Sequence, residues 1–482
     1  MSWLAGLVLS FALLALLRPA IPAPWSWRWR GILLHGGLWL VVHALLVLLL
    51  GRLWFAMALG LALLMLIVQV SNAKYHALRE PFVFQDFEYF TDALRHPRLY
   101  IPFLGWWKFL VIVLVLATAL AIGLWLEPVV VGVRPVAAGV LALGAMLLVV
   151  AARGGQPLFE PLEDMRREGL LASLWDYGWA ERQPLNAPVD VWSALQVPEN
   201  LPDLVVVQSE SFFDARRLGA GVRRDVLATF DDICAEAICS GRLRVPAWGA
   251  NTVRSEFAFL AGLDEAALGV HRFNPYRCIL SSTTETLATR LRAAGYRTVC
   301  VHPYPASFYN RQRVFPHLGF DEFVDIEAFA DAERAGPYVS DKAVTDKVIE
   351  LLAGATQPLF IFVITMENHG PLHLERVQPD DLPALYDMPP PGGCDDLTVY
   401  LRHLRNADAM IGRLRAALVE HSRPARFCWY GDHVPIMPSV YRVFGDPDGQ
   451  TEYFVWQNLK GGCPERRPCT LHSLAKDYLN AG

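Results

Sequence analysis

The chain has 482 residues, of which 53% are apolar and 19% charged, and its mean hydropathy is +0.27. This composition is too apolar for a wholly soluble or a disordered protein of this size. Residues 1–155 hold 11 Lys and Arg against 5 Asp and Glu, whereas the 327 residues that follow hold 32 against 43. A basic, apolar third before an acidic remainder predicts a membrane anchor joined to a globular domain. The acidic balance argues against a nucleic-acid partner.

Five apolar segments in the N-terminal third approach the roughly 20 residues that a helix needs to cross a bilayer. They lie at about 2–17, 31–50, 53–71, 109–126 and 129–152. The first segment does not fit a signal peptide, because it lacks a basic start and Arg18 and Pro19 follow it in place of a small-residue cleavage site. We therefore predict a membrane domain over residues 1–153 with about five transmembrane helices.

The loop charges bear on which side of the membrane the C-terminal domain lies. The segments 18–30 and 72–108 hold three and five Lys and Arg, against one in 51–52 and none in 127–128. By the positive-inside rule this distribution places the C-terminal domain in the cytoplasm. However, 72–108 also carries four acidic residues and is typical of an amphipathic interfacial helix, for which loop charges are a poor guide.

The cysteines indicate the opposite side. All eight lie in the acidic part: Cys234, Cys239, Cys278, Cys300, Cys394, Cys428, Cys463 and Cys469. An even number confined to one domain suggests disulfides and an oxidising compartment, with Cys234–Cys239 and Cys463–Cys469 the closest pairs in the sequence. The alternative is that most are buried free thiols. We follow the disulfide interpretation and predict an extracytoplasmic C-terminal domain.

The pattern changes after a segment rich in Gly, Pro and mixed charge at 154–198, which predicts a linker. From about 199, short apolar runs alternate with stretches of helical periodicity, and continuous apolar runs of this length suit parallel strands covered on both faces. The expected strands are 204–208, 298–301, 359–364 and 427–430, and the expected helices include 286–294 and 404–417. Residues 199–482 are therefore predicted to form an α/β domain with a mainly parallel central sheet.

Three of these strands run into polar clusters. Glu210 follows the first strand, the sequence MENHG follows the third, and Asp432 and His433 follow the fourth. In open α/β sheets ligands bind beyond the carboxyl ends of the strands, so these clusters are expected to converge on one site. Two carboxylates and an imidazole suit a divalent ion such as Mn²⁺ or Zn²⁺ better than Ca²⁺. Each residue taken alone could also serve a helix cap or a turn.

A fourth polar element is the sequence GANTVRSE at 249–256, which leads into a helical stretch. Thr252 could be an ordinary N-cap of that helix. Metal coordination would instead lower the pKa of its hydroxyl and make it a nucleophile.

Taken together, five motifs resemble the sulfatase-like domain of lipoteichoic acid synthases and phosphoglycerol transferases, in the alkaline phosphatase superfamily. The motifs are SES at 209–211, GANTVRSEF at 249–257, HPYPASFYNR at 302–311, NHGP at 368–371 and GDH at 431–433. Their order and spacing match throughout, and five spans before an extracytoplasmic domain are also similar to that family. No CxPxR-type sulfatase motif is present, and VPIMP follows GDH where phosphoethanolamine transferases usually carry further zinc ligands.

The resemblance implies a role for each matched residue. Glu210, Thr252, Asp432 and His433 would bind one divalent metal, Mn²⁺ in typical members with Zn²⁺ or Mg²⁺ as alternatives, and Thr252 would be the nucleophile. The phosphate oxygens and the glycerol headgroup would be held by His302, Arg311 and His369. Tyr309 stands where these synthases usually carry Trp, which changes the expected shape of the headgroup pocket.

The resulting hypothesis is a phosphoglycerol transferase of a bacterial cell (inner) membrane, with its catalytic domain on the periplasmic or extracellular side. It would move glycerol phosphate from phosphatidylglycerol, through a covalent Thr252 intermediate, to an envelope glycan or a polyglycerol-phosphate acceptor. Two alternatives keep the fold: a phosphoethanolamine transferase or metal-dependent phosphate or sulfate ester hydrolase, and a catalytically silent binding domain. The sequence leaves the acceptor open, because acceptor-selecting loops carry no recognisable signature.

Overall fold

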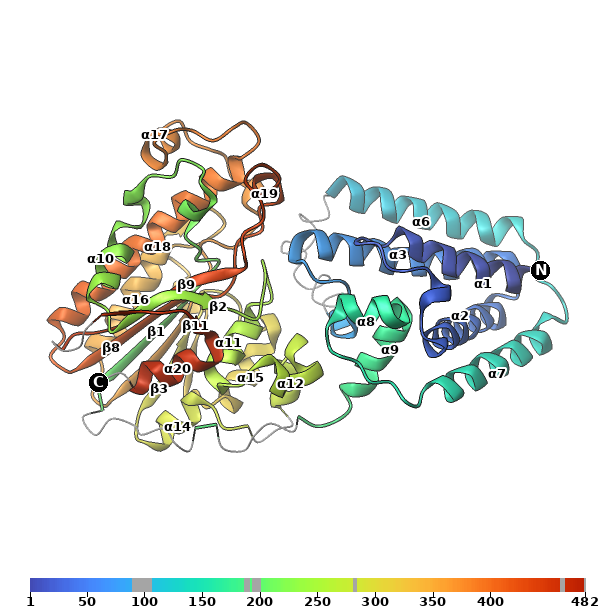
Figure 1. Ribbon diagram of the computed structural model, residues 1–482, viewed down its shortest axis with the longest axis horizontal. Helices are drawn as coiled ribbons and strands as arrows, with labels where there is room; N and C mark the ends of the chain where they lie inside the picture. Colours follow the sequence, from blue (N-terminus) through green and yellow to red (C-terminus); the bar gives the residue numbers. More distant parts are fainter. Residues whose placement is uncertain (89–105, 186–190, 193–200, 281–283, 460–463, 481–482) are drawn as a thin grey trace. The chain divides into compact units, whose positions relative to one another are not determined.

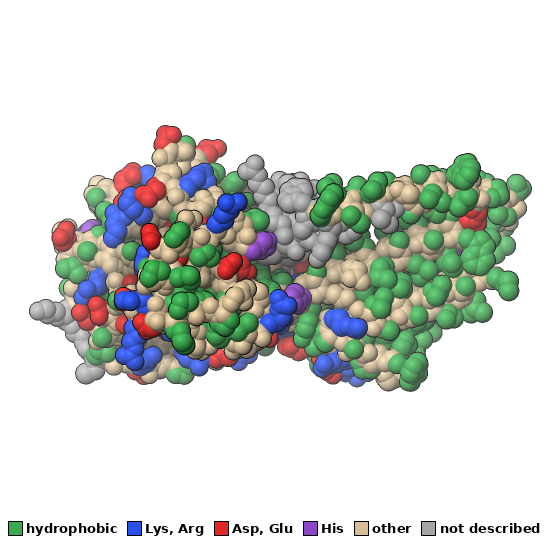
Figure 2. Space-filling model, turned by 90° about the horizontal axis from the view of Figure 1, so that it is seen from above, with side chains coloured by type: hydrophobic (Ala, Val, Ile, Leu, Met, Phe, Trp, Pro, Cys, Tyr) green, Lys and Arg blue, Asp and Glu red, His purple; other side chains and the backbone are tan. Residues whose placement is uncertain are grey.

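The computed structural model describes residues 1–88, 106–185, 191–192, 201–280, 284–459 and 464–480 (Figure 1). The chain divides into two compact units, Met1–Gln183 and Pro184–Gly482. Hydrophobic side chains dominate the surface of the N-terminal unit, whereas Lys, Arg, Asp and Glu are interspersed over the C-terminal unit (Figure 2). This contrast agrees with the split in composition between the two parts of the sequence.

Apolar helices make up most of the N-terminal unit. Within the described residues, three of them, α2, α3 and α7, are long and apolar enough to cross a membrane, and Ser2–Leu16 and Ala117–Leu126 are shorter apolar helical stretches. The backbones of α2 and α7 pack closely where Gly37 faces Gly144, since a Cβ on either glycine would lie about 3 Å from the other's carbonyl oxygen. The helices are α1 (Ser2–Leu13), α2 (Trp29–Leu50), α3 (Leu53–Leu78), α6 (Trp106–Leu126), α7 (Val133–Ala151), α8 (Pro161–Glu168) and α9 (Leu170–Ala180).

The expected linker over 154–198 contains two of these helices. Helices α8 and α9 pack against α2, and the buried Arg30 of α2 pairs with Glu168 and Asp176, each at 2.5 Å. The two acidic partners of Arg30 lie more than a hundred residues away in the sequence. The linker prediction rested on local composition and therefore could not reveal these ion pairs. Residues 89–105 of the predicted interfacial helix over 72–108 lie outside the described residues, and residues 72–78 are the end of α3.

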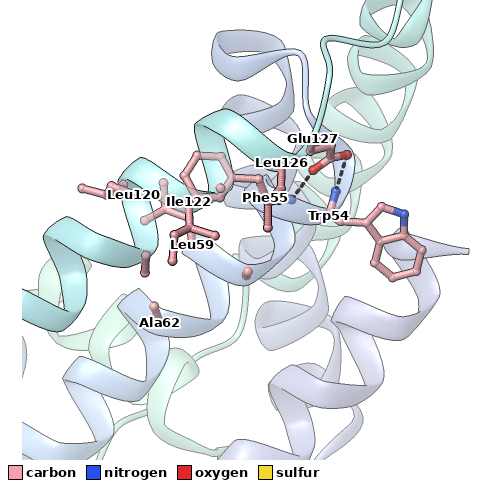
Figure 3. Close-up of a pocket in the computed structure, with 11 residues that line it drawn as sticks. Trp54, Phe55, Leu59, Ala62, Leu120, Ile122, Leu126 and Glu127 are labelled. Carbon is pink, nitrogen blue, oxygen red and sulfur yellow. Dashed lines mark hydrogen bonds between the residues drawn. The ribbon is translucent and has the colours of Figure 1, made fainter.

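A pocket of about 430 Å³ lies between α3 and α6 (Figure 3). Its walls are apolar except at Glu127, whose carboxylate accepts hydrogen bonds from the backbone N–H groups of Trp54 and Phe55 at 3.0 and 2.6 Å. These N–H groups belong to the first turn of α3 and have no partner within the helix, so Glu127 caps it.

A nine-stranded sheet with strand order β10-β2-β9-β8-β1-β7-β3-β4 forms the centre of the C-terminal unit, and β11 pairs with β2. The four strands predicted from the sequence are β1, β3, β7 and β8, and they are mutually parallel. Strand β9 runs antiparallel to β2 and β8. The strands are β1 (Asp203–Ser209), β2 (Cys239–Arg244), β3 (Arg297–Val301), β4 (Glu322–Val324), β7 (Leu359–Ile364), β8 (Ala425–Gly431), β9 (Gln450–Gln457), β10 (Glu465–Arg466) and β11 (Cys469–Thr470), with β5 (Arg334–Ala335) and β6 (Tyr338–Val339) forming a separate hairpin.

Helices cover both faces of this sheet. Val205 and Val207 of β1 point into one core with α10, α16 and α18, whereas Leu204 and Val206 point into a second core with α11, α14, α15 and α20 (Figure 1). A strand buried on both faces reads as a continuous apolar run, as β1 does. The helices are α10 (Ala228–Glu236), α11 (Thr252–Ala261), α12 (Glu265–Leu268), α13 (Tyr276–Ile279), α14 (Leu287–Ala293), α15 (Arg311–His317), α16 (Asp341–Ala353), α17 (Asp381–Leu385), α18 (Asp395–Glu420), α19 (Pro438–Phe444) and α20 (Leu471–Asn480). The predicted α/β class is confirmed.

The disulfide interpretation is wrong for the cysteines that the structure describes. All seven of them are free, including the proposed pair Cys234 and Cys239, and Cys463 lies outside the described residues. Cys300 and Cys428 are fully buried in the second core, where they act as small apolar side chains. Burial raises the pKa of both thiols well above the usual range. The cysteines therefore no longer support an oxidising compartment.

Candidate active site

The site forms where three neighbouring strands end. Strand β1 lies between β7 and β8 and runs parallel to both, with Gln208 paired to Ile364 and Ser209 paired to Gly431. The residues that follow these strands therefore leave the sheet at one edge. Glu210, Asp432 and His433 meet there, with ligand atoms that all lie within 4.8 Å of one another.

These three side chains are almost completely buried, at 4%, 0% and 1% exposure. His433 Nε2 lies 3.3 Å from Asp432 Oδ2 and 3.6 Å from Glu210 Oε1. Ser211 connects the two carboxylates, because its hydroxyl donates to Glu210 Oε1 at 2.9 Å and its backbone N–H donates to Asp432 Oδ1 at 2.8 Å. The carboxylates are thus held in place by the chain itself.

The electrostatics of this cluster suit a cation. Burial, with the Asp432 charge beside it, raises the pKa of Glu210, and burial raises the pKa of Asp432 to about 7. Burial also lowers the pKa of His433, which favours the neutral imidazole that metals bind. Asp432 Oδ2 is buried and has no hydrogen-bond partner of good geometry among the described residues. The cluster thus offers two buried carboxylates, one of which has an oxygen without a hydrogen-bond partner, and a neutral imidazole. These are donors that a divalent metal would satisfy.

Thr252 lies beside this cluster at the start of α11. It is 9% exposed, and its hydroxyl is close enough to Asp432 for a side-chain hydrogen bond that lowers the pKa of that carboxyl. Thr252 is the first helical residue, while the N-cap position belongs to Asn251 in a left-handed conformation with φ of 67°. Thr252 is therefore not the N-cap that the sequence alone also allowed, and its hydroxyl lies near the Asp432 carboxylate. One turn later, Ser255 Oγ donates to the Asp432 carbonyl at 2.7 Å.

Arg311 and His302 lie in a second, fully buried polar group. Arg311 is 1% exposed and pairs through two nitrogens with Glu256, which is 0% exposed. The Tyr276 hydroxyl also donates to Glu256. Although burial opposes the charge, Glu256 raises the pKa of Arg311 above its ordinary value. The guanidinium is thus already engaged by a carboxylate of α11.

The geometry assigns the protons of His302. Its Nδ1 lies 3.0 Å from the Ile364 carbonyl, which can only accept, so Nδ1 carries the proton. Its Nε2 then accepts from Arg311 Nη1 at 3.2 Å. Burial and the Arg311 charge lower the pKa of His302 well below the usual value, in agreement with a neutral ring.

His369 and Tyr309 are only half-buried, unlike the other candidate residues. His369 Nδ1 lies 2.6 Å from the Gly370 carbonyl and 3.3 Å from the hydroxyl of Tyr338, a residue of the β5–β6 hairpin. The imidazole is close enough to Glu210, His433 and His302 to perturb the pKa of each. Tyr309 places its ring 5.2 Å from the Arg311 guanidinium carbon. His369 therefore offers accessible surface next to the cluster, and Tyr309 offers it next to Arg311.

Several residues next to the candidate site residues have a left-handed backbone conformation. The non-glycine residues Ser211, Asn251, Tyr309 and Asn310 all have φ between 53° and 67°. Each of these conformations costs on the order of 1–3 kcal/mol and persists where the surrounding structure holds it in place. They precede or adjoin Thr252, Glu210 and Arg311, so the chain is bent at the points where these side chains are presented.

Three polar residues of the site were not identified from the sequence. Glu256 stands four residues after Thr252 in the quoted motif, and this helical spacing was the available signal. Tyr276 and Tyr338 carry no comparable signal, because each reaches the site through a short element whose position depends on the tertiary fold.

Comparison with known proteins places the C-terminal unit in a family. The sulfatase family model matches residues 202–462, which is more than half of the chain. The capsular polysaccharide biosynthesis protein RkpI of Rhizobium meliloti (strain 1021) is 34% identical over 260 residues, covering 53% of this chain and 45% of that protein. Lipoteichoic acid synthase 1 of Bacillus subtilis (strain 168) is 30% identical over 84 residues, covering 17% and 13%.

Among solved structures, the phosphoglycerol transferase GacH of Streptococcus pyogenes, in complex with sn-glycerol-1-phosphate, aligns with a TM-score of 0.48 at 22% identity. The alignment covers 60% of this chain and 77% of GacH. The chain spans about half the length of the first curated relatives it matches. As its motifs predicted, the chain belongs to the sulfatase family.

Proposed function

We propose that this chain is a membrane-bound, metal-dependent phosphoglycerol transferase. It would move glycerol phosphate from phosphatidylglycerol to an envelope glycan or a polyglycerol-phosphate acceptor. The observation that carries the proposal is the Thr252 hydroxyl, which faces a buried cluster of two carboxylates and an imidazole. Membership of the sulfatase family and the similarity to a lipoteichoic acid synthase over part of the chain support it. The similarity to RkpI supports a glycan acceptor.

We assign Glu210, Thr252, Asp432 and His433 as the ligands of one divalent cation. Three oxygen donors and one imidazole suit Mn²⁺, and Zn²⁺ and Mg²⁺ are the alternatives. A bound cation would lower the pKa of the Thr252 hydroxyl and offset negative charge on the phosphorus oxygens.

In the proposed first step, Thr252 Oγ attacks the phosphorus of the donor lipid. A bond forms between Oγ and phosphorus, the bond from phosphorus to the diacylglycerol oxygen breaks, and that oxygen takes up a proton while the Thr252 hydroxyl loses one. In the second step an acceptor hydroxyl attacks the same phosphorus, and Thr252 Oγ leaves and regains its proton. Thr252 begins α11, whose N-terminal N–H groups favour the negative charge that develops there.

Among the four residues proposed to bind substrate, the exposed ones would contact the headgroup directly. His369 is half-buried beside the cluster and Tyr309 is half-buried beside Arg311, so both can meet the glycerol phosphate. Arg311 and His302 are buried and bonded to each other, and we propose that they bind the phosphate chiefly through the positive charge that Arg311 brings to this side of the site. Glu256 holds that charge in place.

We further propose that residues 1–153 cross the membrane five times and that the sulfatase-like unit lies on the extracytoplasmic face. The donor lipid does not diffuse through water, so a membrane anchor keeps the site near it. An envelope acceptor also lies outside the cytoplasm. The Lys and Arg count of the loops predicts the opposite orientation, so fusion of a reporter enzyme that is active only outside the cytoplasm to the C-terminus tests this placement.

The deciding experiment uses the full chain in detergent with Mn²⁺ and fluorescent phosphatidylglycerol. The wild type should release labelled diacylglycerol and gain one glycerophosphoryl group on the peptide that contains Thr252. Thr252→Ala should do neither, while Thr252→Ser, which keeps a hydroxyl, should retain part of the turnover. Retained turnover in Thr252→Ala would reject the nucleophile assignment.

The donor distinguishes the remaining functions. Release of diacylglycerol only from phosphatidylethanolamine with Zn²⁺ would favour a phosphoethanolamine transferase. Free glycerol phosphate with no acceptor product, in the presence of capsular polysaccharide, would favour a hydrolase. No turnover and no bound metal after gentle purification would favour a silent binding domain.

A further inference from the structure

The loop that carries His369 is anchored by the residue two positions before it. Glu367 is 1% exposed, and its carboxylate accepts three hydrogen bonds from other elements. The Asp341 backbone N–H, at the start of α16, donates at 2.6 Å; His403 Nδ1 donates at 2.9 Å; and Asn406 Nδ2 donates at 2.5 Å. A carboxylate at a helix N-terminus is favoured by the helix dipole as well.

His403 joins Glu367 to a second carboxylate. It is 2% exposed and lies on α18 three residues before Asn406, so both side chains point to the same side of that helix. Its Nε2 donates to Glu375 Oε1 at 3.0 Å, and Glu375 in turn pairs with Arg402 at 2.9 Å. Because both ring nitrogens face carboxylate oxygens, which can only accept, both carry protons and the ring is an imidazolium.

Opposite charges alternate along this row. Glu367 and Glu375 alternate with His403 and Arg402, and Arg402 also pairs with Asp381 at 3.0 Å. Asp341 faces the row as well, and burial with the Glu367 charge raises its pKa well above the usual value. Burial lowers the pKa of His403, but its hydrogen bonds to the two carboxylates outweigh burial and raise the pKa to about 9. Each Glu367 oxygen and each His403 ring nitrogen thus has a charge-assisted hydrogen bond.

At the other end of the same loop, His369 is the accessible imidazole of the site. Its Nδ1 is committed to the Gly370 carbonyl at 2.6 Å, so Nε2 is the nitrogen left to meet a substrate. His302, His403 and His433 are each at most 2% exposed, whereas His369 is half-buried. Because His369 belongs to the loop over 366–370, the position of this loop determines where its imidazole lies relative to Glu210.

We propose that Glu367 and His403 are positioning residues that fix His369 against the metal-binding cluster, an inference that rests on the proposed function. They act through the loop and do not touch the substrate. A misplacement of about 1 Å at a reacting group costs on the order of 100-fold in rate. Loss of the anchor is therefore expected to lower kcat/KM for phosphatidylglycerol about 100-fold.

The test compares Glu367→Gln and His403→Gln with a matched control in the full detergent-purified chain. Asp346→Asn removes the Arg413–Asp346 ion pair, which also joins α16 to α18 but is solvent-exposed. Asn406→Ala is a milder variant, because Asn406 is exposed and only one of the three hydrogen bonds to Glu367 is lost. This variant keeps the inference testable if either buried substitution prevents folding.

The first readout does not require turnover. Imidazoles are labelled with diethyl pyrocarbonate and the labelled peptides are resolved by mass spectrometry. The labelling rate of His369 in Glu367→Gln and in His403→Gln should differ at least three-fold from that in the wild type. It should change less in Asn406→Ala and not at all in Asp346→Asn. The second readout is transfer from phosphatidylglycerol per mole of folded protein, measured below the thermal midpoint of every variant, which should fall in the same order while Mn²⁺ affinity stays close to that of Asp346→Asn.

Unchanged labelling at His369 in both buried variants would overturn the inference, as would a loss of transfer that merely follows a loss of bound Mn²⁺ or of folded protein. If the wild type releases no diacylglycerol, the proposed function fails. The labelling of His369 would still decide whether Glu367 and His403 position it, so the two failures are distinguishable.

Discussion

Removal of one partner of the Arg311–Glu256 pair should strongly destabilise the sulfatase-like unit. Both side chains are at most 1% exposed, so Arg311→Met leaves the Glu256 carboxylate buried without its cation. Breaking a buried ion pair from one side costs about 3–5 kcal/mol. Tyr276 still donates a hydrogen bond to Glu256 and offsets only part of this cost. Glu256→Gln should cost a similar amount because it leaves the guanidinium unpaired.

The double variant separates charge coupling from packing. Arg311→Met with Glu256→Gln leaves two neutral side chains of nearly native volume, so the double loss should be smaller than the sum of the single losses by at least about 2 kcal/mol. Pulse proteolysis of the full chain across a urea series, with the C-terminal fragment as readout, measures each midpoint. At a slope of about 3 kcal/mol per molar urea, each single variant should lower the midpoint by about 1–1.7 M.

Two results would refute this reasoning. Single variants that lose less than about 1 kcal/mol would show that the pair is not buried in solution. A double variant whose loss equals the sum of the single losses would show that the two charges are not coupled. Either result would leave the Arg311 guanidinium free for the direct phosphate contact that the family resemblance implies.

Three further outcomes are expected. Mn²⁺ at about 100 times its dissociation constant should stabilise the wild type by about 2.7 kcal/mol, seen as a higher thermal midpoint, and Asp432→Asn should abolish this shift because it removes a charged ligand of the cluster. The pKa of His403 is raised to about 9 from its ordinary value of 6.5, so its stabilisation is complete below about pH 6.5 and is lost as the pH rises through about 9. The wild type should therefore lose up to about 3 kcal/mol more than His403→Gln between pH 7 and 10 in paired thermal melts; equal losses would contradict the imidazolium assignment. Thiol titration of unreduced, denatured protein should find at least the seven free cysteines of the described residues, and a lower number would restore the disulfide interpretation.

The sequence was informative where local pattern and chemistry coincide. The run over 204–208 is apolar throughout because β1 is buried on both faces, and the polar residues that end it can only lie at the sheet edge. The same reasoning applies to the residues after β7 and β8, so the convergence of Glu210, Asp432 and His433 followed from parallel strand order alone. Thr252 was found because its motif leads into a helix, although the same signal also allowed an N-cap.

Inference failed where a residue's role depends on a partner far along the chain. An even number of cysteines predicted disulfides, yet Cys300 and Cys428 lie in the second core and neither forms a disulfide. The Gly- and Pro-containing segment after α7 predicted a linker, yet α8 and α9 contact α2 through Arg30. Composition cannot distinguish these cases, because it records which groups are present and not what surrounds them.

Local pattern was enough to predict the membrane-like N-terminal part, the α/β class, the sulfatase-like motifs and the edge of the sheet where the candidate site lies, because periodicity and strand polarity are local properties. The folded chain was needed to reveal that Glu256 pairs with Arg311, that Tyr338 contacts His369 and that His403 lies between Glu367 and Glu375. These contacts join residues 28 to 55 positions apart. A buried charge is stable only beside its partner, and that partner is brought near by the packing of helices on the sheet and not by any pattern along the chain.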